Sequence, residues 1–180
     1  MKRSVLFFGW STIIVSVILI FSQIIGLAIT SSVDQITGLL GDYPGVKIGI
    51  LDPMKDMFAY DRIWSYYSIC YFLVTLGAAI QFVRLREIGR RILEIACWVG
   101  MLNACVDTIV SYGFWKQMEA LMGTLSGGVG LPLNQLNPLG LGSIIVGFFL
   151  WIIPSVGILV FLRRPALRAF MSSVKAHAIP

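Results

Sequence analysis

The sequence predicts an all-α membrane protein, a four-transmembrane-helix bundle formed by one membrane domain over residues 1–180. The first observation is composition: the chain is 57% apolar and only 13% charged, whereas a soluble domain carries about 25% charged residues. The second is that four apolar runs reach the roughly 20 residues that a helix needs to cross a hydrocarbon core. These runs are also far longer than the roughly 10-residue segments of a membrane β-barrel, so helices are expected.

The four predicted spans cover about residues 5–29, 63–83, 92–114 and 143–162. The first span follows Lys2 and Arg3, an arrangement that also begins a signal peptide. Its apolar stretch exceeds the roughly 7–15 residues of a signal-peptide core, and no clear cleavage site follows it. We therefore expect a retained span.

Lysine and arginine are unevenly distributed over the connecting segments. With a cytoplasmic N-terminus, the cytoplasmic segments hold Lys2, Arg3, Arg84, Arg86, Arg90, Arg91, Arg163, Arg164, Arg168 and Lys175. The outer segments hold only Lys47, Lys55, Arg62 and Lys116. Because positive residues favour the cytoplasmic side, both termini are predicted to be cytoplasmic. The same rule, together with anionic lipid, accounts for the net charge of +5, so nucleic acid is not expected as a partner.

Residue types that hold metals or perform catalysis are sparse. Cys70, Cys97 and Cys105 lie in predicted spans without zinc spacing, and the only histidine is His177. The aspartates of the first outer loop lack the pattern of a calcium loop. No His, Cys or carboxylate pair is placed for acid and base catalysis. We expect no metal, no cofactor and no enzymatic activity.

The two outer loops, residues 30–62 and 115–142, are predicted to form a partly structured cap. In the first loop, a capping box at Ser32 should open a short helix that ends near Gly41. Asp52 and Pro53 should then begin a helix that continues into the second span. The second loop is nearly uncharged and rich in Gly and Leu. We expect it to lie on the bundle, the membrane interface or a partner subunit, or to follow a shallow re-entrant path.

The cytoplasmic tail, residues 163–180, is predicted to form a basic amphipathic helix on the inner leaflet. Pro165 suits a helix start. The apolar residues recur at helical spacing as Leu167, Phe170, Met171 and Val174. The residues expected to contact membrane lipid are Arg163, Arg164, Arg168 and Lys175.

Two basic segments resemble those of uncharacterised small bacterial four-span inner-membrane proteins. These proteins carry an arginine- and leucine-rich R-L-R pattern after the second span, similar to Arg84 to Leu93 here. They carry an L-R-R-P-x-L-R pattern after the fourth span, similar to the segment from Leu162 to Phe170. The resemblance implies a bacterial inner-membrane location and no known activity.

The third predicted span carries Glu94, Asn103 and Asp107. Inserting an ionisable side chain at the middle of the membrane costs roughly 2.5–3.5 kcal/mol, so such a residue is expected to have a structural or functional role. Glu94 is near the inner end of the span and is expected to pair with Arg90 or Arg91. Asp107 should lie roughly 10 Å below the outer end. It shares a small and polar helix face with Gly100, Asn103, Ala104 and Ser111, and this face is expected to point into the bundle.

The candidate intramembrane polar site is therefore Asp107, Asn103, Ser111 and Glu94. Expected partners of Asp107 are Ser65, Tyr66 or Tyr67 of the second span, or Ser22 and Gln23 of the first. Three roles stay open for Asp107. It could form a structural hydrogen bond within the bundle, take part in proton or ion transfer, or make a polar contact with a partner subunit.

These observations predict a non-enzymatic inner-membrane protein that acts as an accessory, assembly or regulatory subunit, with a protein partner or as a homo-oligomer. The alternative is a small transporter or channel with Asp107 and Asn103 on an ion or proton path.

Overall fold

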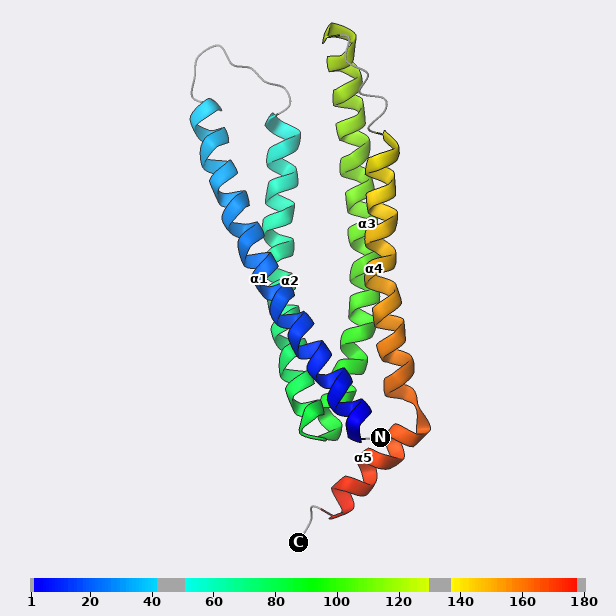
Figure 1. Ribbon diagram of the computed structural model, residues 1–180. Helices are drawn as coiled ribbons and strands as arrows, with labels where there is room; N and C mark the ends of the chain where they lie inside the picture. Colours follow the sequence, from blue (N-terminus) through cyan, green and yellow to red (C-terminus); the bar gives the residue numbers. More distant parts are fainter. Residues whose placement is uncertain (1, 42–50, 130–136, 178–180) are drawn as a thin grey trace.

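The computed structural model describes residues 2–41, 51–129 and 137–177, which form five helices (Figure 1). They are α1 (Lys2–Gly41), α2 (Leu51–Val83), α3 (Glu87–Val129), α4 (Asn137–Arg163) and α5 (Pro165–His177). The first four contain stretches long and apolar enough to cross a membrane: Arg3–Ser32, Phe58–Val83, Glu87–Gln117 and Leu141–Arg163. The predicted helical class and the four helices of membrane-spanning length are confirmed.

The helices extend beyond the predicted spans. α1 continues without a break to Gly41, so the short helix predicted in the first outer loop is the last part of α1, and α2 begins at Leu51, beside the predicted start at Asp52. The prediction of a loop over residues 115–142 is wrong for most of its length, because α3 continues to Val129 and α4 begins at Asn137. Residues 115–122 are mostly good helix formers, and an Asn-Pro pair suits a helix start. The predicted contact of the second outer loop with the bundle, the membrane interface or a partner concerns residues 130–136 as well, and these lie outside the described residues.

The four long helices form two antiparallel pairs, α1 with α2 and α3 with α4, which are joined by packing of α2 on α3 (Figure 1). The pairs converge where α2 turns into α3 and diverge towards their other ends (Figure 1). α1 and α4 make few contacts with each other. One of these contacts is the stack of the Phe8 ring on the Phe161 ring, with centroids 4.1 Å apart. The N-terminus and α5 also lie at the convergent end, which we call the basic end because Arg84, Arg86, Arg90, Arg91 and Arg163 gather there.

The turn between α2 and α3 depends on two residues. Leu85 adopts a left-handed conformation with φ 58°, and its amide donates a hydrogen bond to the Phe82 carbonyl at 2.9 Å. A methyl group at Gly89 would lie 2.7 Å from the Ala78 carbonyl oxygen, so only glycine lets the first turn of α3 pack directly on α2. These two positions fix the tight hairpin at the basic end.

The apolar core lies at the basic end and receives side chains from all five helices. Its buried members include Val5, Phe82, Leu93 and Leu162, together with Leu167 and Met171 of α5. The last two are 0% and 1% exposed. The expectation that these two side chains lie on lipid is therefore wrong. α5 follows α4 almost directly, so it turns back under the bundle and buries part of its apolar face there. The side chains of Val174 and Lys175 lie outside the described residues.

Candidate functional sites in the membrane helices

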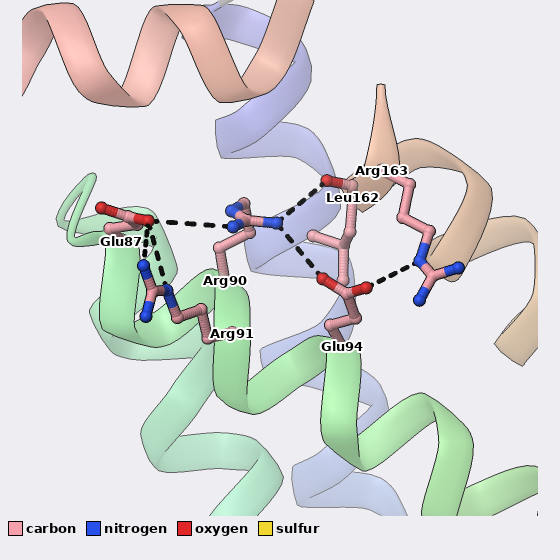
Figure 2. A network of polar contacts seen from close by, with 6 residues as sticks. All are labelled: Glu87, Arg90, Arg91, Glu94, Leu162 and Arg163. Atoms are coloured by element: carbon pink, nitrogen blue, oxygen red, sulfur yellow. Dashed lines mark hydrogen bonds and ion pairs between the residues drawn. The ribbon is translucent and has the colours of Figure 1, made fainter. Parts of the chain in front are cut away.

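A network of charged side chains joins the beginning of α3 to the end of α4 (Figure 2). Glu94 Oε2 accepts a hydrogen bond from Arg90 Nη1 at 3.2 Å, and Glu94 Oε1 accepts one from Arg163 Nε at 2.6 Å. Arg90 Nη1 also lies 3.5 Å from the Leu162 carbonyl oxygen. The Arg90 side chain is 9% exposed and the Glu94 side chain 18%, so the network neutralises charges that lie largely inside the protein.

The sequence predicted that Glu94 pairs with Arg90 or Arg91, and the structure has the pair with Arg90. Arg91 does not pair with Glu94, because it points to Glu87 and donates to its Oε1 at 2.9 Å. Arg163 is the partner that the sequence did not indicate, and its guanidinium also lies 5.6 Å from the centre of the Trp98 ring. Half of the Arg163 side chain is exposed, so its predicted contact with lipid stays a prediction.

Asp107 lies in the divergent half of α3, between two small cavities. One has a volume of about 50 Å³ and is lined by Asp107 together with Gln23, Ser68 and Asn103 among others. The second has a volume of about 210 Å³ and is lined by Asp107 with Thr108, Ser111, Ser143 and Gly147 among others. Asp107 is half-buried, and no hydrogen bond to its carboxylate is found among the described residues.

Asn103 and Gly100 of the predicted polar face contact α2 within the bundle. Tyr67, one of the partners expected for Asp107, instead donates a hydrogen bond from its hydroxyl to Asn103 Oδ1 at 3.0 Å. Tyr71 donates to the Ala96 carbonyl at 2.7 Å, and a methyl group at Gly100 would lie 2.7 Å from the Tyr71 hydroxyl. Small residues on α3 therefore allow the tyrosines of α2 to pack close, as the sequence predicted for this face.

A larger cavity, which the sequence did not indicate, lies between α1 and α4. Its volume is about 690 Å³, within the roughly 300–1,000 Å³ range of ligand pockets. Its lining includes Phe7, Val15, Leu19, Leu93, Leu150 and Pro154. Residues from four helices form it, and they become neighbours only because the two helix pairs diverge. We call it the α1–α4 cavity.

Candidate metal ligands do not cluster in the described part of the chain. Among the residues whose side chains the structure describes, no group of three or more His, Cys, Asp or Glu is placed to hold a metal ion. Cys70, Cys97 and Cys105 are free thiols in separate turns of α2 and α3.

No protein-family model, curated protein or solved structure matches this chain. The class of protein therefore rests on the fold: an all-helical protein whose four long apolar helices are compatible with an integral membrane protein.

Proposed function

We propose that this protein is a non-enzymatic integral membrane protein that serves as an accessory, assembly or regulatory subunit of a partner membrane protein. The observation that carries this proposal is the cavity of about 210 Å³ between α3 and α4, in the half of these helices that is away from the basic end. Asp107 and Ser111 line it from α3, and Ser143 and Gly147 line it from α4. We call this cavity the α3–α4 notch.

The chemistry of the notch suits a second transmembrane helix. A carboxyl group in hydrocarbon is costly unless it receives a hydrogen bond or faces water, and Asp107 receives none from the described residues. A partner helix that carries a Ser, Thr, Asn, Gln or Lys side chain at this depth would supply the donor. The absence of a side chain at Gly147 and the small Ser111 and Ser143 permit the close approach that such packing requires.

The proposed orientation places the basic end in the cytoplasm, with both termini there. Ten of the fourteen lysines and arginines lie in the three parts of the sequence that meet at this end: the N-terminus, the region of the α2–α3 turn and the tail after α4. Positive residues near span ends favour the cytoplasmic side. The proposal includes a bacterial inner membrane as the location, which follows the resemblance of the two basic segments. It also retains lipid contacts for the basic residues of the tail, Arg163, Arg164, Arg168 and Lys175.

A second candidate function is a small transporter or channel, and one observation favours it. Asp107 borders both small cavities, of about 50 and 210 Å³, and Asn103 lines the smaller one. A carboxyl group between two cavities is suited to passing a proton or cation from one to the other. This role requires an ionisable group at position 107, which the docking role does not.

Site-specific photo-crosslinking tests the docking proposal. A photoreactive amino acid at Ser111, at the notch, should give a discrete adduct in native membranes. The matched control is Leu102, nine residues earlier on α3 and therefore on the opposite side of the helix, where the side chain is 66% exposed. We expect no discrete adduct there.

The mass of the adduct identifies the occupant of the notch. A product at twice the 19.9 kDa of the chain would indicate a homo-oligomer, and any other discrete product would indicate a different subunit. No adduct from Ser111, or the same adduct from Ser111 and Leu102, would contradict docking at the notch.

A further inference from the structure

The α1–α4 cavity opens sideways towards the membrane. α1 and α4 make few contacts, and their stacked rings Phe8 and Phe161 lie at the basic end. Above this stack, Val15 and Leu150 line the cavity from the two helices, and both side chains are exposed. A molecule dissolved in the bilayer can therefore reach the cavity between α1 and α4 without passing through water.

The cavity presents an apolar interior, although several hydroxyl-bearing residues line it. Thr12 donates its hydroxyl hydrogen to the Phe8 carbonyl at 2.8 Å, Thr75 to Tyr71 at 2.9 Å and Ser155 to Trp151 at 2.8 Å. Each of these hydroxyls is satisfied by the backbone of its own helix. Cavities of apolar character stay dry, and an empty one loses dispersion contacts along its whole wall. An apolar chain is the occupant that fits these walls.

The length of the cavity matches one leaflet of a bilayer. Its lining on α1 runs from Phe7 to Leu19, which at 1.5 Å per residue corresponds to about 18 Å along the helix. Half of a hydrocarbon core is about 15 Å. The cavity begins near the first turns of α1, so it spans the leaflet at the basic end and reaches about the middle of the membrane.

Unpaired positive charge lies at the basic end of the cavity. Arg3 precedes Phe7 by one helical turn and so lies on the same side of α1. Arg164 follows Phe161 by three residues, and the Phe161 ring stacks on Phe8, which lines the cavity. Both arginines are exposed, and no ion pair to either is found among the described residues. An anionic group held at the head of an apolar chain would meet them at the membrane surface.

We propose that the α1–α4 cavity binds one acyl chain of an anionic phospholipid from the leaflet at the basic end, with its phosphate at Arg3 and Arg164. Volume, length and polarity select an acyl chain, and the two arginines select an anionic head group. This site is separate from the α3–α4 notch and does not depend on the proposed docking function. A lipid bound there fills the gap that α1 and α4 leave open and holds the two helix pairs together.

Native mass spectrometry of the full-length protein tests the chain-binding part. The protein is purified in mild detergent and offered equal amounts of phosphatidylglycerol and phosphatidylcholine with identical chains. We expect one phosphatidylglycerol to stay bound. Ser155→Phe, which places a ring in the cavity, should lower its retention at least tenfold. The matched control, Val156→Phe, introduces the same phenyl ring at an exposed side chain that does not line the cavity and should retain lipid like the parent.

Two further variants keep the test decisive. If Ser155→Phe lowers folded yield, Gly157→Leu replaces it, because a methyl group at Gly157 meets no atom within 4 Å. The double variant Arg3→Gln/Arg164→Gln should bring the retention of phosphatidylglycerol down to that of phosphatidylcholine, whereas Arg84→Gln, in the α2–α3 turn, should not. Equal retention by the Ser155→Phe and Val156→Phe proteins would overturn the cavity as the chain site. Equal retention of both lipids by the parent would overturn the anionic assignment.

Discussion

Arg163 Nε, at the end of α4, lies 2.6 Å from Glu94 Oε1 in the second turn of α3, and this ion pair holds the α3–α4 pair together at the basic end (Figure 2). The other carboxylate oxygen of Glu94 faces the largely buried Arg90. One acidic side chain thus pairs with two arginines from two helices. Its loss leaves the largely buried Arg90 with only the Leu162 carbonyl oxygen at 3.5 Å and the Glu87 carboxylate at 3.9 Å, whereas loss of Arg163 leaves the Glu94–Arg90 pair intact.

Glu94→Gln should therefore lower the free energy of unfolding by about 2–3 kcal/mol, because hydrogen bonds to a charged group are lost and Arg90 stays buried. Arg163→Gln should cost less than about 1 kcal/mol, since half of that side chain is exposed. Unfolding in mixed micelles, followed by circular dichroism, measures both. The control is Arg91→Gln, whose side chain is 69% exposed and whose loss should cost less than about 0.5 kcal/mol. Equal losses in all three variants would mean that the network contributes no specific stability.

The tail gives a second prediction, because α5 packs on the bundle through Leu167 and Met171. Leu167→Ala and Met171→Ala should each lower the free energy of unfolding by about 2–5 kcal/mol through loss of buried volume. Ala166→Ser changes an exposed neighbour and should be nearly neutral. Limited proteolysis after Pro165, combined with thermal unfolding, measures both effects. Release of the tail by these substitutions without any loss of bundle stability would indicate that α5 rests on lipid alone.

The α2–α3 turn gives a third prediction. Gly89→Ala places a methyl group 2.7 Å from the Ala78 carbonyl oxygen and should destabilise the protein by about 1–3 kcal/mol through overpacking against backbone. The matched control is Gly113→Ala in the same helix, where a methyl group meets no atom within 4 Å. That change should be neutral or stabilising by up to about 1 kcal/mol, because alanine favours helix. Comparable effects of the two substitutions on the melting temperature would contradict the close packing at Gly89.

The helical class and the four long apolar helices could be predicted because length and hydropathy alone determine them. The Glu94–Arg90 pair could also be predicted, since both residues lie on one helix at a fixed spacing. Arg163 could not, because it lies 69 residues from Glu94 and nothing local indicates how α4 ends against α3.

Two other features escaped prediction for the same physical reason. An amphipathic tail helix has the same sequence pattern whether its apolar side chains face lipid or protein, so the burial of Leu167 required the tertiary arrangement. The α1–α4 cavity arises from the divergence of two helix pairs and has no signature in any single helix. The sequence singled out Asp107 as a polar residue among apolar ones, but Tyr67, one of its expected partners, pairs with Asn103 instead.

The orientation of the helices gives a fourth prediction. Epitope tags at either terminus should be cytoplasmic, and tags inserted within residues 42–50 or 130–136 should be external, because lysine and arginine concentrate at the basic end. Protease protection in spheroplasts and inverted vesicles measures this. An external C-terminus together with a cytoplasmic N-terminus would contradict an even number of crossings.

Asp107 gives the fifth prediction and tests the docking proposal most directly, because the two candidate functions differ in what Asp107→Asn does. Asparagine keeps the size and the hydrogen-bonding ability of aspartate but cannot take up and release a proton. In a docking role, Asp107→Asn should fold and keep the partner, whereas Asp107→Leu should fold and lose it, since a partner's donor would then stay unpaired. In a proton-carrying role, Asp107→Asn should fold and be inactive.

The deciding measurement is the amount of partner subunit that co-purifies with folded parent, Asp107→Asn and Asp107→Leu proteins under identical extraction, with Leu102→Asn as a lipid-facing control. The docking proposal predicts full recovery for the parent, most of it for Asp107→Asn, and a loss of at least tenfold for Asp107→Leu alone. If Asp107→Leu folds and recovers as much partner as the parent does, Asp107 does not dock a partner and the proposed function is wrong.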